Sequence, residues 1–217
     1  MTDNRRSSLA LIAGSAGMII TMALHPMGRI APSEVEAMVR KLLEVHSVAL
    51  SSILLLFLGA WGMARHLSGP DRLSWAGLGI FGYAVAAILT GAVFDGLVEP
   101  RLLQQIVGSA GATRDVWQTL MMYNGIVDGA FVRVYVVAVG VAILVWSAAM
   151  VKNKQMGLGV ALYGGLLGVV TVIGVLTGML RPETHGFALV IVGEALWFLI
   201  AGAALWREPQ EMLGRTA

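Results

Sequence analysis

The sequence predicts an all-α integral membrane protein, a single domain over 1–217 built as a bundle of six transmembrane helices. Of its 217 residues, 57% are hydrophobic and only 13% are charged, and the mean hydropathy is +0.78. Soluble domains carry about a quarter charged residues, because a small domain has much surface to cover. The excess apolar side chains are therefore expected to face lipid, and the bilayer is the expected partner.

Six apolar runs have the length of about 20 residues that crosses a bilayer as a helix. Each run is expected to be helical, since backbone amides in lipid find partners only inside a helix or in a closed barrel. The runs lack the alternating pattern of a membrane barrel. The predicted spans are 8–25, 46–65, 73–95, 131–151, 156–180 and 187–206.

The first span ends at His25-Pro26, and no small-x-small cleavage site follows it. We therefore interpret it as a retained membrane helix, with a cleaved signal peptide as the alternative. The second span begins well before its apolar part, because a serine followed by acidic residues is typical of a helix start. One helix is expected over 33–67 and another long helix over 113–152. Both would extend beyond the outer face of the membrane.

The third span is followed by a long connection over 96–115 on the same outer side. The fifth span contains two Gly-x-x-x-Gly pairs, which allow helix backbones to approach closely. We interpret them as packing inside the bundle, with a homo-oligomer interface as the alternative. The pairs are Gly164 with Gly168 and Gly174 with Gly178. The sixth span ends at Trp206, where an interfacial aromatic anchor is expected.

Charge and cysteine content limit the location and the classes of function. Lys and Arg are in slight excess on the side of the termini, which favours cytoplasmic termini in a multi-pass cell-membrane protein of the bacterial inner-membrane type. The net charge of +2 is small and the basic residues are scattered, so nucleic acid is not an expected partner. The absence of cysteine excludes disulfides, thiolate metal sites and cysteine nucleophiles.

Ionisable residues concentrate near the outer ends of the spans. With a rise of about 1.5 Å per residue, His25, His46 and Asp95 lie at the outer edge of the apolar layer. Glu194 lies deeper, about 20 Å from the inner end of its span. A charge in the hydrocarbon costs at least about 2.5–3.5 kcal/mol, so such a residue usually faces a cavity or a partner.

Residue spacing predicts that these groups converge in an outward-facing polar cavity. Asp95 and Glu99 are four residues apart and share a helical face, as do Asn124 and Asp128. Imidazoles with carboxylates are the usual ligands of a divalent metal such as zinc when thiolates are absent. The predicted roles are metal ligation by His25, His46 and His185, ligand binding by Asp95, Glu99, Asn124 and Arg133, and acid–base catalysis by Glu194 and Asp128.

Structural interpretations of the same residues stay open. His25 and His185 can cap helix ends or contact headgroups, and Asp95 and Glu99 can form ion pairs with a basic residue. His25 and His46 are also a candidate pair of haem ligands. Motifs of zinc proteases, serine hydrolases and phosphate-binding loops are absent from the sequence.

Three functions are compatible with this pattern. The leading hypothesis is a cavity that binds a cation, a metal or a small polar ligand. As an enzyme, the protein would be a membrane-embedded hydrolase or isomerase that acts on lipid, so a lipid is a further candidate partner. The second is a proton- or cation-coupled transporter of small solutes that uses Glu194 for coupling. The third is a non-catalytic membrane subunit or scaffold that binds partner helices through its glycine faces.

Overall fold

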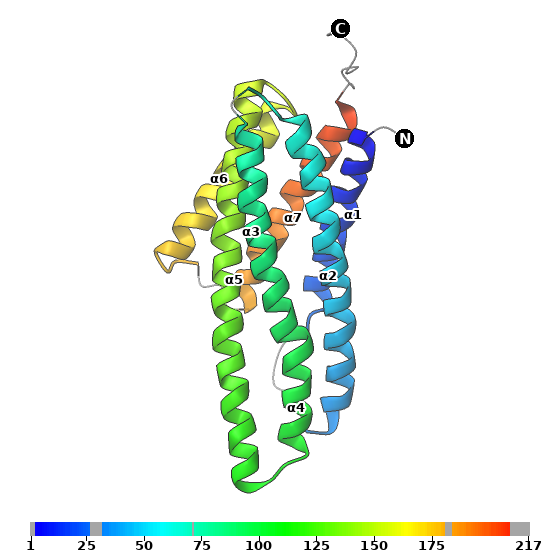
Figure 1. Cartoon of the computed structure of the whole chain (residues 1–217), viewed down its shortest axis with the longest axis vertical. Helices are drawn as coiled ribbons and strands as arrows, with labels where there is room; N and C mark the ends of the chain where they lie inside the picture. Colours follow the sequence, from blue (N-terminus) through cyan, green and yellow to red (C-terminus); the bar gives the residue numbers. More distant parts are fainter. Residues whose placement is uncertain (1–2, 27–31, 71, 181–183, 209–217) are drawn as a thin grey trace.

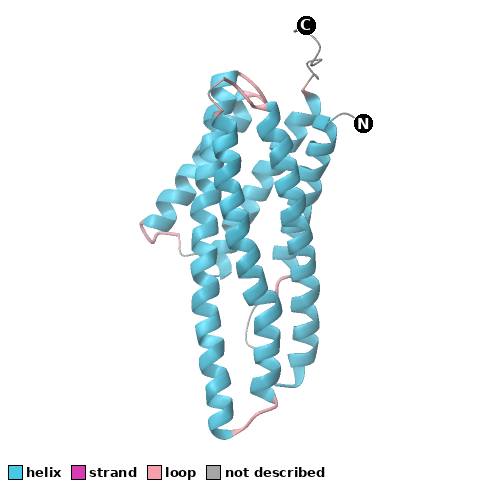
Figure 2. Ribbon diagram, viewed as in Figure 1, coloured by secondary structure: helices cyan, strands magenta, loops and turns pink. Residues whose placement is uncertain are grey.

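The structure is a computed structural model that describes residues 3–26, 32–70, 72–180 and 184–208. Within these ranges the chain forms helices and turns without any β-strand (Figure 2). Six helical segments are long and apolar enough to cross a membrane. The predicted all-α bundle with six candidate spans is therefore confirmed.

At the end of the molecule where both termini lie, short turns join consecutive helices (Figure 1). A 3₁₀ turn, η1, precedes the second helix, and a π-helical turn, η2, joins the third helix to the fourth. The elements are α1 (Asp3–Leu24), η1 (Pro32–Glu34), α2 (Val35–His66), α3 (Leu73–Val93), η2 (Phe94–Val98), α4 (Glu99–Val107), α5 (Gly111–Asn153), α6 (Leu158–Leu176) and α7 (Thr184–Arg207).

Both predicted long helices are present as α2 and α5. The 43 residues of α5 give a length of about 65 Å, which exceeds the hydrocarbon thickness of about 30 Å. The connection expected over 96–115 is different, because most of it is helical and α3, η2 and α4 continue one another. Residues 35–44 of α2, α4, and 111–127 of α5 form a group of helices that we call the extension (Figure 1).

A group of large aromatic side chains fills the bundle between the extension and the termini. Trp146 and Trp197 stack with their ring centroids 6.1 Å apart, and Phe81 and Phe198 pack against them. All four are at most 2% exposed. The indole N–H groups donate to the Ser74 carbonyl at 3.0 Å and to that of Val160 at 3.2 Å, so both polar groups are satisfied. We call these four rings the aromatic block.

The first glycine pair of the fifth span packs inside the bundle. A Cβ on Gly164 would overlap Trp197 and Ser147, and a Cβ on Gly168 would lie 2.7 Å from the Gly140 carbonyl. The second pair does not form such a contact surface, because Gly178 lies beyond the end of α6 at a φ of +73°. The first pair thus lets α6 approach α5 and α7 closely, as small residues do in membrane helices.

Candidate metal site

A cavity of 430 Å³ lies where α1 ends and the extension begins. Residues of α1 and the two residues after it, and of α2, α3, η2, α4, α5 and α7, surround it. Its ionisable lining consists of His25, His46, Asp95, Glu99 and Asp128. Among the described residues no lysine or arginine lines it, so the two imidazoles are the basic groups that it offers to three carboxylates. Such a site attracts cations.

Asp95 is the centre of a cluster with two histidines. Its Oδ2 lies 3.1 Å from Nε2 of His25 and 2.9 Å from Nε2 of His46. The two imidazole rings meet edge to face, with centroids 5.4 Å apart. His46 is buried, with 5% of its surface exposed, whereas His25 and Asp95 are partly accessible. The sequence positions of the three residues are far apart, so the fold itself assembles the cluster.

The hydrogen bonds of His46 determine which of its two ring nitrogens carries the proton and which carries a lone pair. Nδ1 lies 2.8 Å from the Leu42 carbonyl oxygen. Since a carbonyl can only accept, Nδ1 must donate. In a neutral imidazole Nε2 then carries a lone pair, which points at the carboxylate oxygen 2.9 Å away. Two such acceptors need a proton or a metal ion between them.

The π-helical turn presents Asp95 to the histidines. Pro100 has no amide hydrogen for the carbonyl four residues earlier, so regular α-helical bonding is interrupted there. The Glu99 N–H instead bonds to the Phe94 carbonyl, five residues back. That carbonyl also accepts a 3.3 Å hydrogen bond from Nδ2 of Asn124 on α5. π-Helical turns of this kind are rare and are frequent at functional sites.

Two glycines make room for the side chains of the site. A Cβ on Gly96 would overlap the ring of His46, so only glycine allows η2 to approach α2 this closely. A Cβ on Gly91 would lie 3.0 Å from Oδ1 of Asp128. Sequence reasoning missed both glycines. An isolated glycine within an apolar helix does indicate close approach, but not its partner.

The other predicted site residues take different positions. Asp128 and Glu99 line the cavity with the cluster. Asn124 is buried and supports η2 instead of lining the cavity. Arg133, predicted to bind a ligand, is exposed on another face of α5 and does not line the cavity. The His185 backbone belongs to α7, but its side chain lies outside the described part of the chain.

Glu194 does not join the cavity, contrary to the predicted convergence. It is 2% exposed, and its Oε2 accepts a 2.8 Å hydrogen bond from the Tyr135 hydroxyl. Phe187 lines the cavity and packs edge-on against Tyr135 with ring centroids 6.3 Å apart. The Tyr135–Glu194 pair therefore lies behind Phe187. Sequence reasoning overlooked Tyr135, although a hydroxyl inside an apolar span indicates a need for a polar partner.

Comparison with known proteins does not name this site. No model of a protein family, no curated protein and no solved structure matches the chain.

Proposed function

We propose that this membrane protein binds a divalent metal ion of the zinc class through Nε2 of His25, Nε2 of His46 and a carboxylate oxygen of Asp95. The observation that carries the proposal is the pair of contacts that the His46 ring makes. Its Nδ1 donates a hydrogen bond to the Leu42 carbonyl, and its Nε2 faces the Asp95 carboxylate. Metal-bound histidines almost always donate their second ring nitrogen to a carbonyl or a carboxylate. The same bond leaves the other nitrogen free to coordinate.

The spacing of the donor atoms suits such an ion. Two ligands bound tetrahedrally at zinc distances are about 3.3 Å apart. The two His–Asp contacts measure 2.9 and 3.1 Å, and the donor atoms of all three residues lie within 4.8 Å of one another. A small outward adjustment of the side chains would make room for the ion. Three protein ligands leave a fourth position for water, as in catalytic zinc sites.

The cavity supplies groups for hydrolysis at that fourth position. A bound metal would act as a Lewis acid and would lower the pKa of its water toward neutrality. Asp128 and Glu99 line the same cavity and are not needed as ligands, so either can serve as the general base. The activity proposed is therefore metal-assisted hydrolysis of a substrate that enters from the extension side.

The aromatic block disfavours the transport hypothesis. Four rings that are at most 2% exposed occupy the bundle between the site and the termini. Their indole N–H groups already bond to backbone carbonyls, so they offer no polar lining to a solute. A scaffold role, for its part, gives no reason for two imidazoles and three carboxylates to share one cavity.

Elemental analysis of the purified protein tests the proposal. We expect about one zinc-class ion per chain in the wild type, and a loss of at least about tenfold in metal affinity in His46→Ala and Asp95→Asn, because each removes a ligand. His66→Ala is the matched control, since His66 lies on the same helix at the opposite end. Equal metal content in all four proteins would overturn the metal site.

Thermal unfolding after chelation gives a second measurement. Removal of an ion present at about 1,000 times its Kd is expected to lower the free energy of unfolding of the wild type by about 4 kcal/mol. The same treatment should destabilise Asp95→Asn less, by about 1.4 kcal/mol less for each tenfold loss of metal affinity, because that variant binds the ion more weakly. A wild type that is insensitive to chelators would contradict the proposal.

A further inference from the structure

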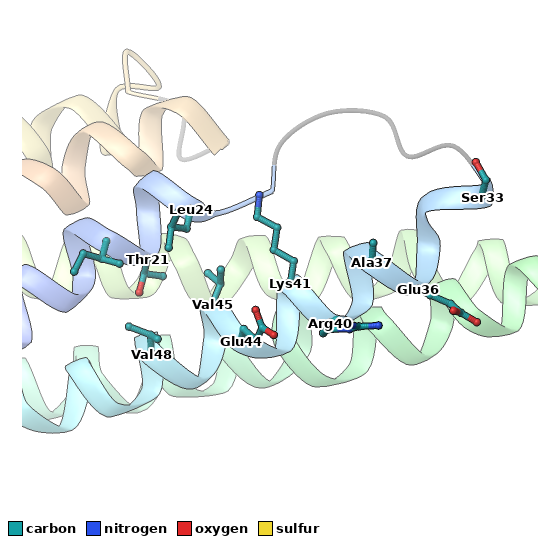
Figure 3. Close-up of a pocket in the computed structure, with 11 residues that line it drawn as sticks. Thr21, Leu24, Ser33, Glu36, Ala37, Arg40, Lys41, Glu44, Val45 and Val48 are labelled. Atoms are coloured by element: carbon teal, nitrogen blue, oxygen red, sulfur yellow. The ribbon is translucent and has the colours of Figure 1, made fainter.

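A second hollow, a groove of 770 Å³, lies between α1 and the first half of α2 (Figure 3). It is separate from the cavity, although Thr21 lines both. Val45 faces the groove and its neighbour His46 faces the cavity, so α2 forms the wall between them. None of the residues assigned to the metal site lines the groove.

The groove changes from apolar to charged along its length. At one end Thr21 and Leu24 of α1 face Val45 and Val48 of α2 (Figure 3). Leu24 and Val48 are 53% and 41% exposed, and they lie within the apolar runs, where the surrounding solvent is acyl chain. This end of the groove therefore opens to lipid.

The charged end begins at Glu44, next to Val45, and continues toward the start of α2. It carries two acidic and two basic side chains, namely Glu36, Arg40, Lys41 and Glu44. With a rise of about 1.5 Å per residue, Lys41 lies about 6 Å beyond Val45, at the level of the phospholipid headgroups. The apolar end of the groove thus lies at the level of the acyl chains, and the charged end lies at the level of the headgroups of the same leaflet.

The four charged side chains are available to a ligand. Within the described part of the chain, none of them lies within 4 Å of an oppositely charged group. Arg40 has a carboxylate one helical turn away on each side, at Glu36 and Glu44. The end of the groove therefore offers cationic and anionic contacts side by side, with a formal sum of zero.

We propose that the groove binds one zwitterionic phospholipid, whose head contains a phosphodiester and an ammonium group. Arg40 and Lys41 bind the phosphodiester oxygens, for which guanidinium and ammonium groups are the usual donors. Glu36, the furthest of the four from Val45 and about 12 Å along the helix from Glu44, binds the lipid ammonium, and the first acyl-chain segment lies along Leu24 and Val48. An anionic lipid that lacks the ammonium would leave the Glu36 carboxylate beside the phosphate without a cationic partner, so it fits less well.

Native mass spectrometry of the full chain in detergent tests this site. The probes are phosphatidylethanolamine and phosphatidylglycerol with identical acyl chains, which differ in the presence of the ammonium. We expect the wild type to bind phosphatidylethanolamine about two- to fivefold more tightly, since one exposed ion pair contributes at most about a factor of five. Equal binding, or a preference for phosphatidylglycerol, would overturn the proposal.

Paired variants assign the two halves of the headgroup. Glu36→Gln with Glu44→Gln is expected to abolish the preference between the lipids, whereas Arg40→Gln with Lys41→Gln weakens binding of both. Arg114→Gln with Asp115→Asn is the control, because it removes an exposed basic and acidic pair elsewhere on the extension. If the glutamate variant keeps the wild-type preference, or the control loses it, the assignment is wrong. Metal content should stay unchanged throughout.

Discussion

The two ring nitrogens of His46 have different neighbours, and this difference decides the chemistry of the cluster. A backbone carbonyl holds Nδ1 at 2.8 Å, and a carboxylate faces Nε2 at 2.9 Å. The carbonyl belongs to Leu42, one turn earlier on the same helix, so the ring orientation depends little on distant packing. His25 lacks such support, because its Nδ1 is buried without a partner among the described residues.

Gly96→Ala tests the close approach of η2 to His46. The added methyl group overlaps the imidazole, so either the ring or η2 must shift, and His46 and Asp95 move apart. We expect loss of the metal and a decrease of about 1–3 kcal/mol in the free energy of unfolding, as for other overpacked sites. Elemental analysis and thermal unfolding measure the two effects.

Gly79→Ala on α3 is the matched control for that variant. A Cβ there meets no described atom within 4 Å. The change should therefore leave metal binding intact and stabilise the helix by up to about 1 kcal/mol. If Gly96→Ala and Gly79→Ala have the same metal content and stability, the close contact between Gly96 and His46 is not required for the site.

At this scale the sequence predicts part of the site. Residue spacing and depth bring out His25, His46 and Asp95, because all three lie at the same level of the bundle. Depth alone does not give the direction in which a side chain points. Glu194 illustrates this, since it faces Tyr135 and not the cavity. Arg133 is a similar case, because it lies on an exposed face of α5 and does not line the cavity.

At the scale of elements, η2 connects a backbone irregularity to the position of a carboxylate. The sequence 96–115 contains glycines and a proline, which normally indicate a connection. The chain instead forms a π-helical turn and continues as α4, because the widened turn accommodates Pro100 and α4 buries Pro100 and Leu102. A breaker signal cannot distinguish an interrupted helix from a helix that ends.

Pro100→Ala restores an amide hydrogen to α4 and makes regular α-helical bonding through η2 favourable. A change of register by one residue rotates the preceding helix by about 100° relative to the following one. We expect Asp95 to leave the histidines and metal affinity to fall at least about tenfold, while thermal stability is kept or raised. Titration of the apoprotein with zinc measures the affinity.

The control for this element is Pro70→Ala, in the turn between α2 and α3. It removes a proline far from the cavity and should leave zinc binding unchanged. Tight zinc binding by Pro100→Ala would show that η2 does not depend on the proline.

At the scale of the whole molecule, α6 has two different faces. Gly164 contacts α5 and α7, whereas a Cβ on its neighbour Gly165 meets no described atom within 4 Å. Large apolar side chains such as Leu162 and Leu166 are more than 60% exposed on the outer side. The sequence motif indicates close packing of a helix, but it does not by itself give the direction of the partner.

Gly164→Ala is expected to lower the free energy of unfolding by about 1–3 kcal/mol, because the methyl group overlaps Trp197 and Ser147. Gly165→Ala should be neutral or slightly stabilising. Thermal unfolding in detergent measures both, and light scattering reports the oligomeric state. If Gly165→Ala, and not Gly164→Ala, changes the oligomeric state or the stability, the outer face is an interface between copies.

The aromatic block also governs how the membrane potential acts on the site. Moving one elementary charge across the full potential costs about 2.3 kcal/mol per 100 mV. The block consists of four buried, uncharged rings between the cavity and the termini, so we expect much of the voltage drop to fall across this part of the bundle. A cation that enters from the extension side crosses only a small share of that field. Occupancy of the cavity should therefore follow the ion concentration in the adjoining aqueous phase and be nearly independent of whether the membrane is energised.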